Sequence, residues 1–197
     1  MKKAFLYFYF AAISTILASA GSSLRTLAQE TGPESAASVV KTKVYSSLDA
    51  VPRGKEFQIA VVVDIENGYH MNSHKPLDSY LIPTTLTPQL PEGFTLADTV
   101  YPPGKNLKFP FSPDKPLNVY TQSVILRMRV TAGENAKLGG TPIPITLRYQ
   151  ACNNSACLPP VKVPVTAQIK VAEAGAKTHA EHPEIFSAPA GKPSQEN

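Results

Sequence analysis

Apolar and polar residues alternate along four segments of the chain. They are residues 56–65, 124–130, 143–149 and 163–171, and in each of them every second residue is apolar. A period of two is typical of a β-strand that turns one face towards a core. Weaker strands are predicted at 39–45, 80–86 and 94–100, where Pro, Gly, Asn or Asp mark the turns. The pattern therefore predicts about seven strands.

No segment has the period of 3.6 residues that would indicate a long helix. The 19 prolines of the 197-residue chain also disfavour helices, because proline lacks the backbone N–H. Short strands separated by turns predict an all-β fold, an antiparallel β-sandwich of immunoglobulin-like type. The chain has no tryptophan and its two cysteines are close in sequence. It therefore departs from antibody domains, in which a tryptophan packs on an inter-sheet disulfide.

The amino terminus differs from the rest of the chain. Two lysines precede an apolar run at 4–17, and small residues follow at 18–20. This order is typical of a secretory signal peptide. The apolar run of about 14 residues is shorter than the roughly 20 that span a bilayer. We therefore predict a signal peptide at 1–20 and export from the cytoplasm; cleavage after Ala20 or after Ala28 is equally acceptable.

Composition divides the remaining chain into three parts. Residues 21–37 and 173–197 have almost no periodic apolar positions, so a flexible linker and a disordered tail are predicted there. The folded domain is predicted at 38–172. It has no second long apolar stretch, so no stable membrane insertion is expected after cleavage. Loss of two lysines with the signal peptide lowers the formal net charge from +4 to +2, which is too little for a nucleic-acid partner.

Both cysteines lie in the segment YQACNNSACLPP, residues 149–160. Cys152 and Cys157 are separated by four residues and lie between two predicted strands. A disulfide is expected in an exported protein. A bridge over so short a loop stabilises a fold by only about 2 kcal/mol, against about 4.7 kcal/mol for a 100-residue loop. An exposed loop also lets the thiolate of another protein reach the sulfurs. The residues alone leave open an exchanging pair and a structural bridge.

A metal site is a further interpretation. His70, Met71 and His74 lie in HMNSH, a set of ligands that suits copper. Addition of Cys152 and Cys157 completes a two-His, two-Cys zinc set, although an oxidising compartment would remove the thiolates that zinc needs. A binding or assembly module with a purely structural disulfide also stays open, because immunoglobulin-like folds host many functions.

The cysteine segment resembles the active site of the amino-terminal periplasmic domain of the thiol:disulfide interchange protein DsbD. In that family a Tyr-Gln dipeptide leads into a cysteine pair that is closed by two prolines. The segments IENGYHMNSHKP, YLIPTTL, LPEGFTLADTVYP and LNVYTQSVILRMRV are also similar to the family, so the resemblance covers 39–171. It implies an immunoglobulin-like fold, a periplasmic location and a loop that caps the disulfide until a partner docks.

The resemblance also implies how the pair would work. Cys157 would form the mixed disulfide with a partner, and Cys152 would resolve it. Reducing equivalents would come from a thioredoxin-like domain fed by a membrane electron carrier, and would leave to oxidised periplasmic proteins. This sequence has no transmembrane segment or thioredoxin-like domain after the cysteines, so both are expected as separate chains. If the protein is an enzyme, we expect a redox relay of thiol-disulfide oxidoreductase type without a bound cofactor.

Four further residues are expected around the pair. Val100 and Tyr101 fall where the cap loop of the family lies. Tyr69 and His70 match a Gly-aromatic-aromatic stretch in which the second ring lines the redox site. His70 can donate a hydrogen bond to a sulfur anion or take up its proton. The chain departs from the family in a longer proline-rich segment after the cap position, PPGKNLKFPFSPDKP, and in the cysteine gap of four residues, where the best-known member has five.

Overall fold

The computed structural model describes residues 35–187. The predicted signal peptide, most of the predicted linker and residues 188–197 lie outside the described residues. The described part consists of strands and loops with one short helix, and the all-β, immunoglobulin-like prediction is confirmed. The elements are β1 (Val40–Ser46), β2 (Val51–Pro52), β3 (Lys55–Ile65), β4 (His70–Asn72), β5 (Thr85–Pro88), β6 (Phe94–Val100), β7 (Lys105–Phe109), β8 (Ser112–Tyr120), β9 (Ser123–Ala132), β10 (Gly139–Tyr149), β11 (Ala151–Cys152), β12 (Val161–Ala172) and α1 (Pro183–Phe186).

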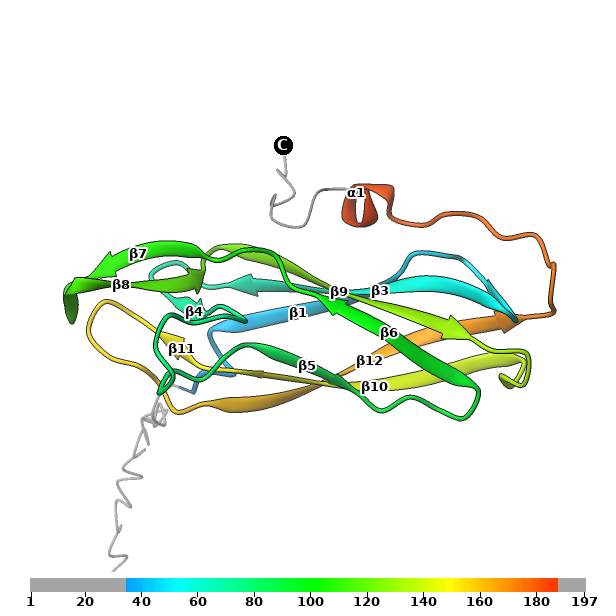
Figure 1. Cartoon of the computed structure of the whole chain (residues 1–197), viewed down its shortest axis with the longest axis horizontal. Coiled ribbons are helices and arrows are strands. Elements are labelled where there is room, and N and C mark those ends of the chain that lie inside the picture. Colours follow the sequence, from blue (N-terminus) through cyan, green and yellow to red (C-terminus); the bar gives the residue numbers. More distant parts are fainter. Residues whose placement is uncertain (1–34, 188–197) are drawn as a thin grey trace, which may run out of the picture. The chain divides into compact units, whose positions relative to one another are not determined.

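These strands form three four-stranded sheets (Figure 1). The first has the order β1-β3-β9-β6 and the second the order β2-β12-β10-β5. They face each other as the two layers of the sandwich, and the third sheet, β11-β4-β8-β7, lies at one end of them (Figure 1). Because Cys152 is the last residue of β11, the cysteines lie at this end.

The hydrophobic core lies between the first two sheets. Alternate residues of β3 and β9 meet alternate residues of β10 and β12, as the period of two predicts. The largest completely buried side chains of these four strands are Tyr149, Ile59, Leu126, Met128, Ile143, Ile145, Leu147 and Ile169. A close-packed core of this kind gives the strands that lead to the cysteines a fixed position.

Parts of both predicted flanks pack on the sandwich. The carbonyl of Ala36 accepts a hydrogen bond from the buried hydroxyl of Tyr149 at 2.7 Å. Residues 173–187 return over the outer face of the first sheet, where Ile185 contributes to a second apolar cluster (Figure 1). The structure therefore differs from the predicted flanks at 35–37, where Ala36 belongs to the main core, and at 173–187, where Ile185 covers apolar residues on the outer face of β3 and β9.

Two local predictions are also corrected. The strand predicted at 80–86 exists only at its end, as part of β5, and Tyr80 is 74% exposed in the loop that precedes it. The proline-rich segment after Tyr101, expected as a loop, contains the β7–β8 hairpin. Within residues 35–187 no helix has the length and apolar character needed to cross a bilayer.

Candidate redox site

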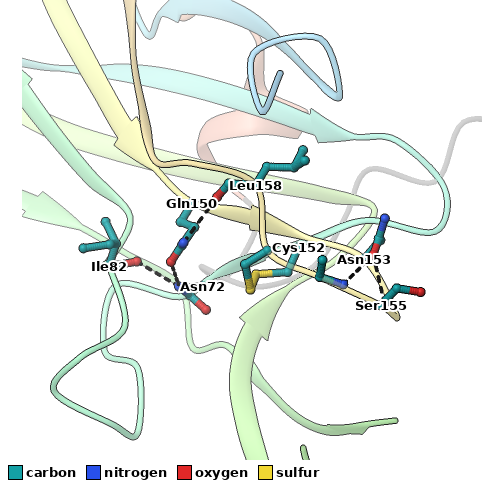
Figure 2. Close-up of a disulfide and its surroundings, with 9 residues drawn as sticks. Asn72, Ile82, Gln150, Cys152, Asn153, Ser155 and Leu158 are labelled. Atoms are coloured by element: carbon teal, nitrogen blue, oxygen red, sulfur yellow. Dashed lines mark hydrogen bonds between the residues drawn. A yellow bond between two sulfur atoms is a disulfide. The ribbon is translucent and has the colours of Figure 1, made fainter. Parts of the chain in front are cut away.

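Cys152 and Cys157 form a disulfide at the end of β11 (Figure 2). They also face each other as an antiparallel bridge, as expected for residues on the two sides of a hairpin. Their environments differ. Cys152 is completely buried, whereas Cys157 is exposed. The bond is therefore open to solvent from the side of one cysteine only.

The loop between the cysteines is a tight turn organised by Asn153. The side-chain oxygen of Asn153 accepts hydrogen bonds from the backbone N–H groups of Ser155 and Ala156, both at 2.9 Å. The N–H of Asn153 donates to the carbonyl of Ala156 at 2.9 Å, which closes the turn. Asparagine favours such turns because its short side chain can replace a backbone acceptor. The turn brings Cys157 back to Cys152 and leaves its small side chains in solvent.

A network of amide groups holds the cysteine hairpin to β4. The side-chain nitrogen of Asn72 donates to the Gln150 side-chain oxygen at 3.3 Å and to the Ile82 carbonyl at 3.1 Å (Figure 2). Gln150 in turn donates to the carbonyl of Leu158 at 3.3 Å, across the base of the hairpin. The side-chain oxygen of Asn72 is buried and has no hydrogen-bond partner among the described residues. The Tyr-Gln dipeptide before the cysteines therefore has a structural role.

His70 is the strand partner of Cys152. The two residues are directly opposite each other in the β4–β11 pair, so their side chains extend from the same face of the sheet. His70 is 2% exposed, and its ring stacks on that of Phe109 with 3.9 Å between centroids. Burial lowers the pKa of His70 to about 4, because a charged imidazolium would lose its hydration. His70 is thus a neutral, buried imidazole beside the disulfide.

The aromatic cover of His70 comes from the β7–β8 hairpin. Phe109 lies directly on the imidazole, and Phe111 lies 6.3 Å from it and nearly parallel to it. Val100 and Tyr101, expected at the cap, are placed elsewhere. Val100 pairs with Arg127 at the end of β6, and Tyr101 stacks on His74 at 3.6 Å. The cover of His70 comes instead from the proline-rich segment that follows Tyr101, which folds into the β7–β8 hairpin.

The other expected residues do not gather at the disulfide. Tyr69 packs against the main core. Met71 is completely buried in that core, and Nδ1 of His74 lies 3.0 Å from the carbonyl of Thr84. The copper interpretation needs His70, Met71 and His74 to converge, and the zinc interpretation needs both histidines beside the two cysteines. The structure places His70 on Phe109 and His74 on Tyr101. In the described part of the chain, no three His, Cys, Asp or Glu side chains form a group that could hold a metal.

The site is thus a disulfide at the end of a hairpin of a β-sandwich, with one cysteine buried and the other exposed. Residues 36–169 match the family model of the amino-terminal domain of thiol:disulfide interchange protein DsbD. The chain belongs to this family, and the resemblance predicted from the sequence is confirmed.

Two solved structures are similar to the chain. The reduced amino-terminal domain of Neisseria meningitidis DsbD is 20% identical and has a TM-score of 0.39, over 70% of this chain and 89% of that one. The amino-terminal periplasmic domain of ScsB from Proteus mirabilis is 10% identical and has a TM-score of 0.50, over 80% of this chain. The match covers 53% of the ScsB domain, so the chain spans about half of its length. At this identity the likeness to the ScsB domain shows the fold alone. No curated protein sequence matches the chain significantly.

Proposed function

We propose that the protein is an exported thiol-disulfide exchange module that passes reducing equivalents from a thioredoxin-like donor to periplasmic partners through Cys152 and Cys157. Membership of the DsbD amino-terminal family supports this type of reaction. The signal-like sequence at 1–20 supports export. The observation that carries the proposal is the unequal burial of the two cysteines.

The exchange would begin at Cys157. A partner thiolate attacks its exposed sulfur in line with the disulfide, and a new disulfide forms between the partner and Cys157. The original bond breaks, and Cys152 leaves with the electron pair as a thiolate. The second thiol of the donor then attacks the mixed disulfide, so that the donor leaves as a disulfide and Cys152 and Cys157 are both thiols. In the next exchange the Cys157 thiolate attacks the disulfide of a periplasmic partner, and Cys152 attacks the resulting mixed disulfide, which releases the partner reduced and restores the Cys152–Cys157 bond. Cys157 is thus the residue that meets partners, and Cys152 is the resolving residue.

His70 would stabilise or protonate the thiolate that forms at Cys152. A thiolate formed in a buried site is unstable unless it is paired or protonated. Nε2 of His70 is buried and has no hydrogen-bond partner among the described residues, so it is available to the neighbouring sulfur. An imidazole can donate a hydrogen bond to the thiolate or deliver a proton to it. We therefore assign His70 to the stabilisation of the leaving sulfur.

Trapping by single cysteine variants tests the proposal. Cys152→Ser leaves the exposed Cys157 free, and it should accumulate mixed disulfides with a thioredoxin-like protein. Cys157→Ser is the matched control, because it leaves only the buried Cys152, and it should trap at least about tenfold less. Non-reducing gel electrophoresis and mass spectrometry measure the adducts. If both variants stay folded and neither captures the partner, exchange is refuted. If Cys152→Ser unfolds and captures nothing, the disulfide is structural.

A further inference from the structure

Two phenylalanines of the β7–β8 hairpin lie over the buried His70. Phe109 stacks on the imidazole, and Phe111 lies beside Phe109, with the planes of the two phenylalanines 11° apart and 5.6 Å between centroids. Phe111 is 40% exposed. Phe109 covers one face of the imidazole as long as the tip of the β7–β8 hairpin is in place. Access of water to His70 therefore depends on this hairpin.

The tip of the hairpin is held less firmly than the sandwich. β7 is the outermost strand of its sheet and pairs only with β8, and the register between them shifts after Leu107. Residues 105–108 are all exposed. Lifting of the tip would therefore separate Phe109 from His70 without breaking a pair between β3, β9, β10 and β12. Local opening of such an edge element costs much less than global unfolding.

Two charged side chains lie near His70. Glu66, in the turn before β4, lines the same cavity of about 220 Å³ as His70, Phe109 and Asn154. Lys108 precedes Phe109 and is exposed, and the cysteine loop at 153–156 contains no charged residue. The pKa of His70 is lowered through burial. His70 is neutral because burial removes most of the hydration that an imidazolium needs.

We propose that Phe109 is a positioning residue that keeps His70 neutral, and that lifting of the hairpin lets His70 take up a proton beside Cys152. This inference rests on the proposed exchange. A partner that displaces the hairpin would meet an imidazolium next to the leaving sulfur. When the disulfide breaks, Cys152 takes the electron pair and the proton of Nε2 passes to its sulfur. His70 is then neutral again, and the hairpin can close over a reduced pair.

The sign of the pH dependence follows from linkage. In the closed form the pKa of His70 is about 4, and with the hairpin lifted it returns towards 6.5. The closed form binds fewer protons than the open form. The free-energy difference that favours the closed form is therefore largest above pH 6.5 and decreases as the pH falls towards 4. The ratio of open to closed hairpin should be about 30-fold higher at pH 5 than at pH 8. Acid therefore opens the hairpin.

An NMR titration of the His70 ring in the oxidised full chain tests the role of Phe109. We expect a pKa near 4 in the wild type, and Phe109→Ala should raise it towards 6.5. Phe111→Ala should raise it less, because Phe111 lies farther from the imidazole, and Phe186→Ala on α1 is the remote control. Phe109→Leu keeps an apolar side chain at this position, and the same titration is made on it if Phe109→Ala unfolds. A wild-type pKa near 6.5, or a value near 4 in Phe109→Ala, overturns the proposal.

The reciprocal measurement follows the hairpin. Relaxation dispersion at the amides of Lys108 and Ser112 gives the open population. It should increase about 30-fold from pH 8 to pH 5 in the wild type and stay constant in His70→Phe, which keeps a flat ring but does not titrate. Equal pH dependence in both proteins overturns the inference. Neither measurement uses a partner protein, so a failure of trapping would refute the exchange and leave the link between Phe109 and His70 standing.

Discussion

Ile185→Ala measures what the carboxy-terminal segment adds to the fold. Ile185 is 7% exposed and packs on Ala60, Val62 and Ile125 at the outer face of β3 and β9. The substitution removes three carbon atoms from this contact. At about 0.8 kcal/mol for each buried CH₂, the segment should lose about 2 kcal/mol of its docking free energy. Because the segment is docked in the native state, the free energy of unfolding of the whole domain should fall by the same amount.

Urea denaturation and amide hydrogen exchange are the assays. The N–H of Glu181 donates to the Ser47 carbonyl at 2.9 Å and reports whether the segment is docked. A loss of about 2 kcal/mol corresponds to about 30-fold faster exchange of this amide. Glu184→Ala changes an exposed side chain on the same short helix and is the control. If Ile185→Ala stays within about 0.5 kcal/mol of the wild type, the segment does not stabilise the domain and the reasoning is wrong.

Two further substitutions test the supports of the redox site. Tyr149→Phe leaves the Ala36 carbonyl without its donor, so the free energy of unfolding measured in urea should fall by about 1–3 kcal/mol. Tyr45→Phe is the control and should have little effect. Equal losses in the two variants would exclude a role for the Tyr149 hydroxyl. Asn153→Ala removes the acceptor of two loop amides, so the reduced loop gains freedom. Its equilibrium with glutathione should shift about fivefold towards the dithiol, or about 1 kcal/mol; an unchanged constant would show that the turn does not hold the sulfurs together.

The inner layer of the sandwich could be predicted from the sequence because its pattern is local. Ile59 and Val61 follow the period of two, and both are completely buried in the structure. The same strand also carries Ala60 and Val62 on its other face, so it is apolar on both sides. A strand buried on both faces indicates that something covers the outside. The cover, residues 178–186, could not be identified, because a short segment that buries a single isoleucine and is otherwise held by hydrogen bonds has no period to detect.

The redox site could be predicted in part, for the same physical reason. Cys152 and His70 lie in strands that pair with each other, and the resemblance in sequence had placed both at the redox site. The Phe109 contact depends on a fold-back of the β7–β8 hairpin over β4, which joins positions almost 40 residues apart. The prolines of this segment favour its interpretation as a loop. Two phenylalanines in a polar, proline-rich segment nevertheless indicate that their rings pack on another part of the protein. Val100 and Tyr101 were expected there because they fall at the position of the family's cap loop, and the sequence gives no sign that the following segment folds back over β4.

The unequal burial of the cysteines follows from the point at which the hairpin leaves the sandwich. Cys152 is the last residue that still pairs with β4, so its side chain shares the dry environment of His70. Cys157 comes after the turn that Asn153 organises, where no strand covers it. A bridge between the middle of β10 and the middle of β12 would bury both sulfurs, and a bridge at a loop tip would expose both. At the end of a strand, one sulfur can be attacked while the other leaves towards a group that can protonate it. The position of the disulfide, more than the length of its loop, is therefore what suits it to exchange.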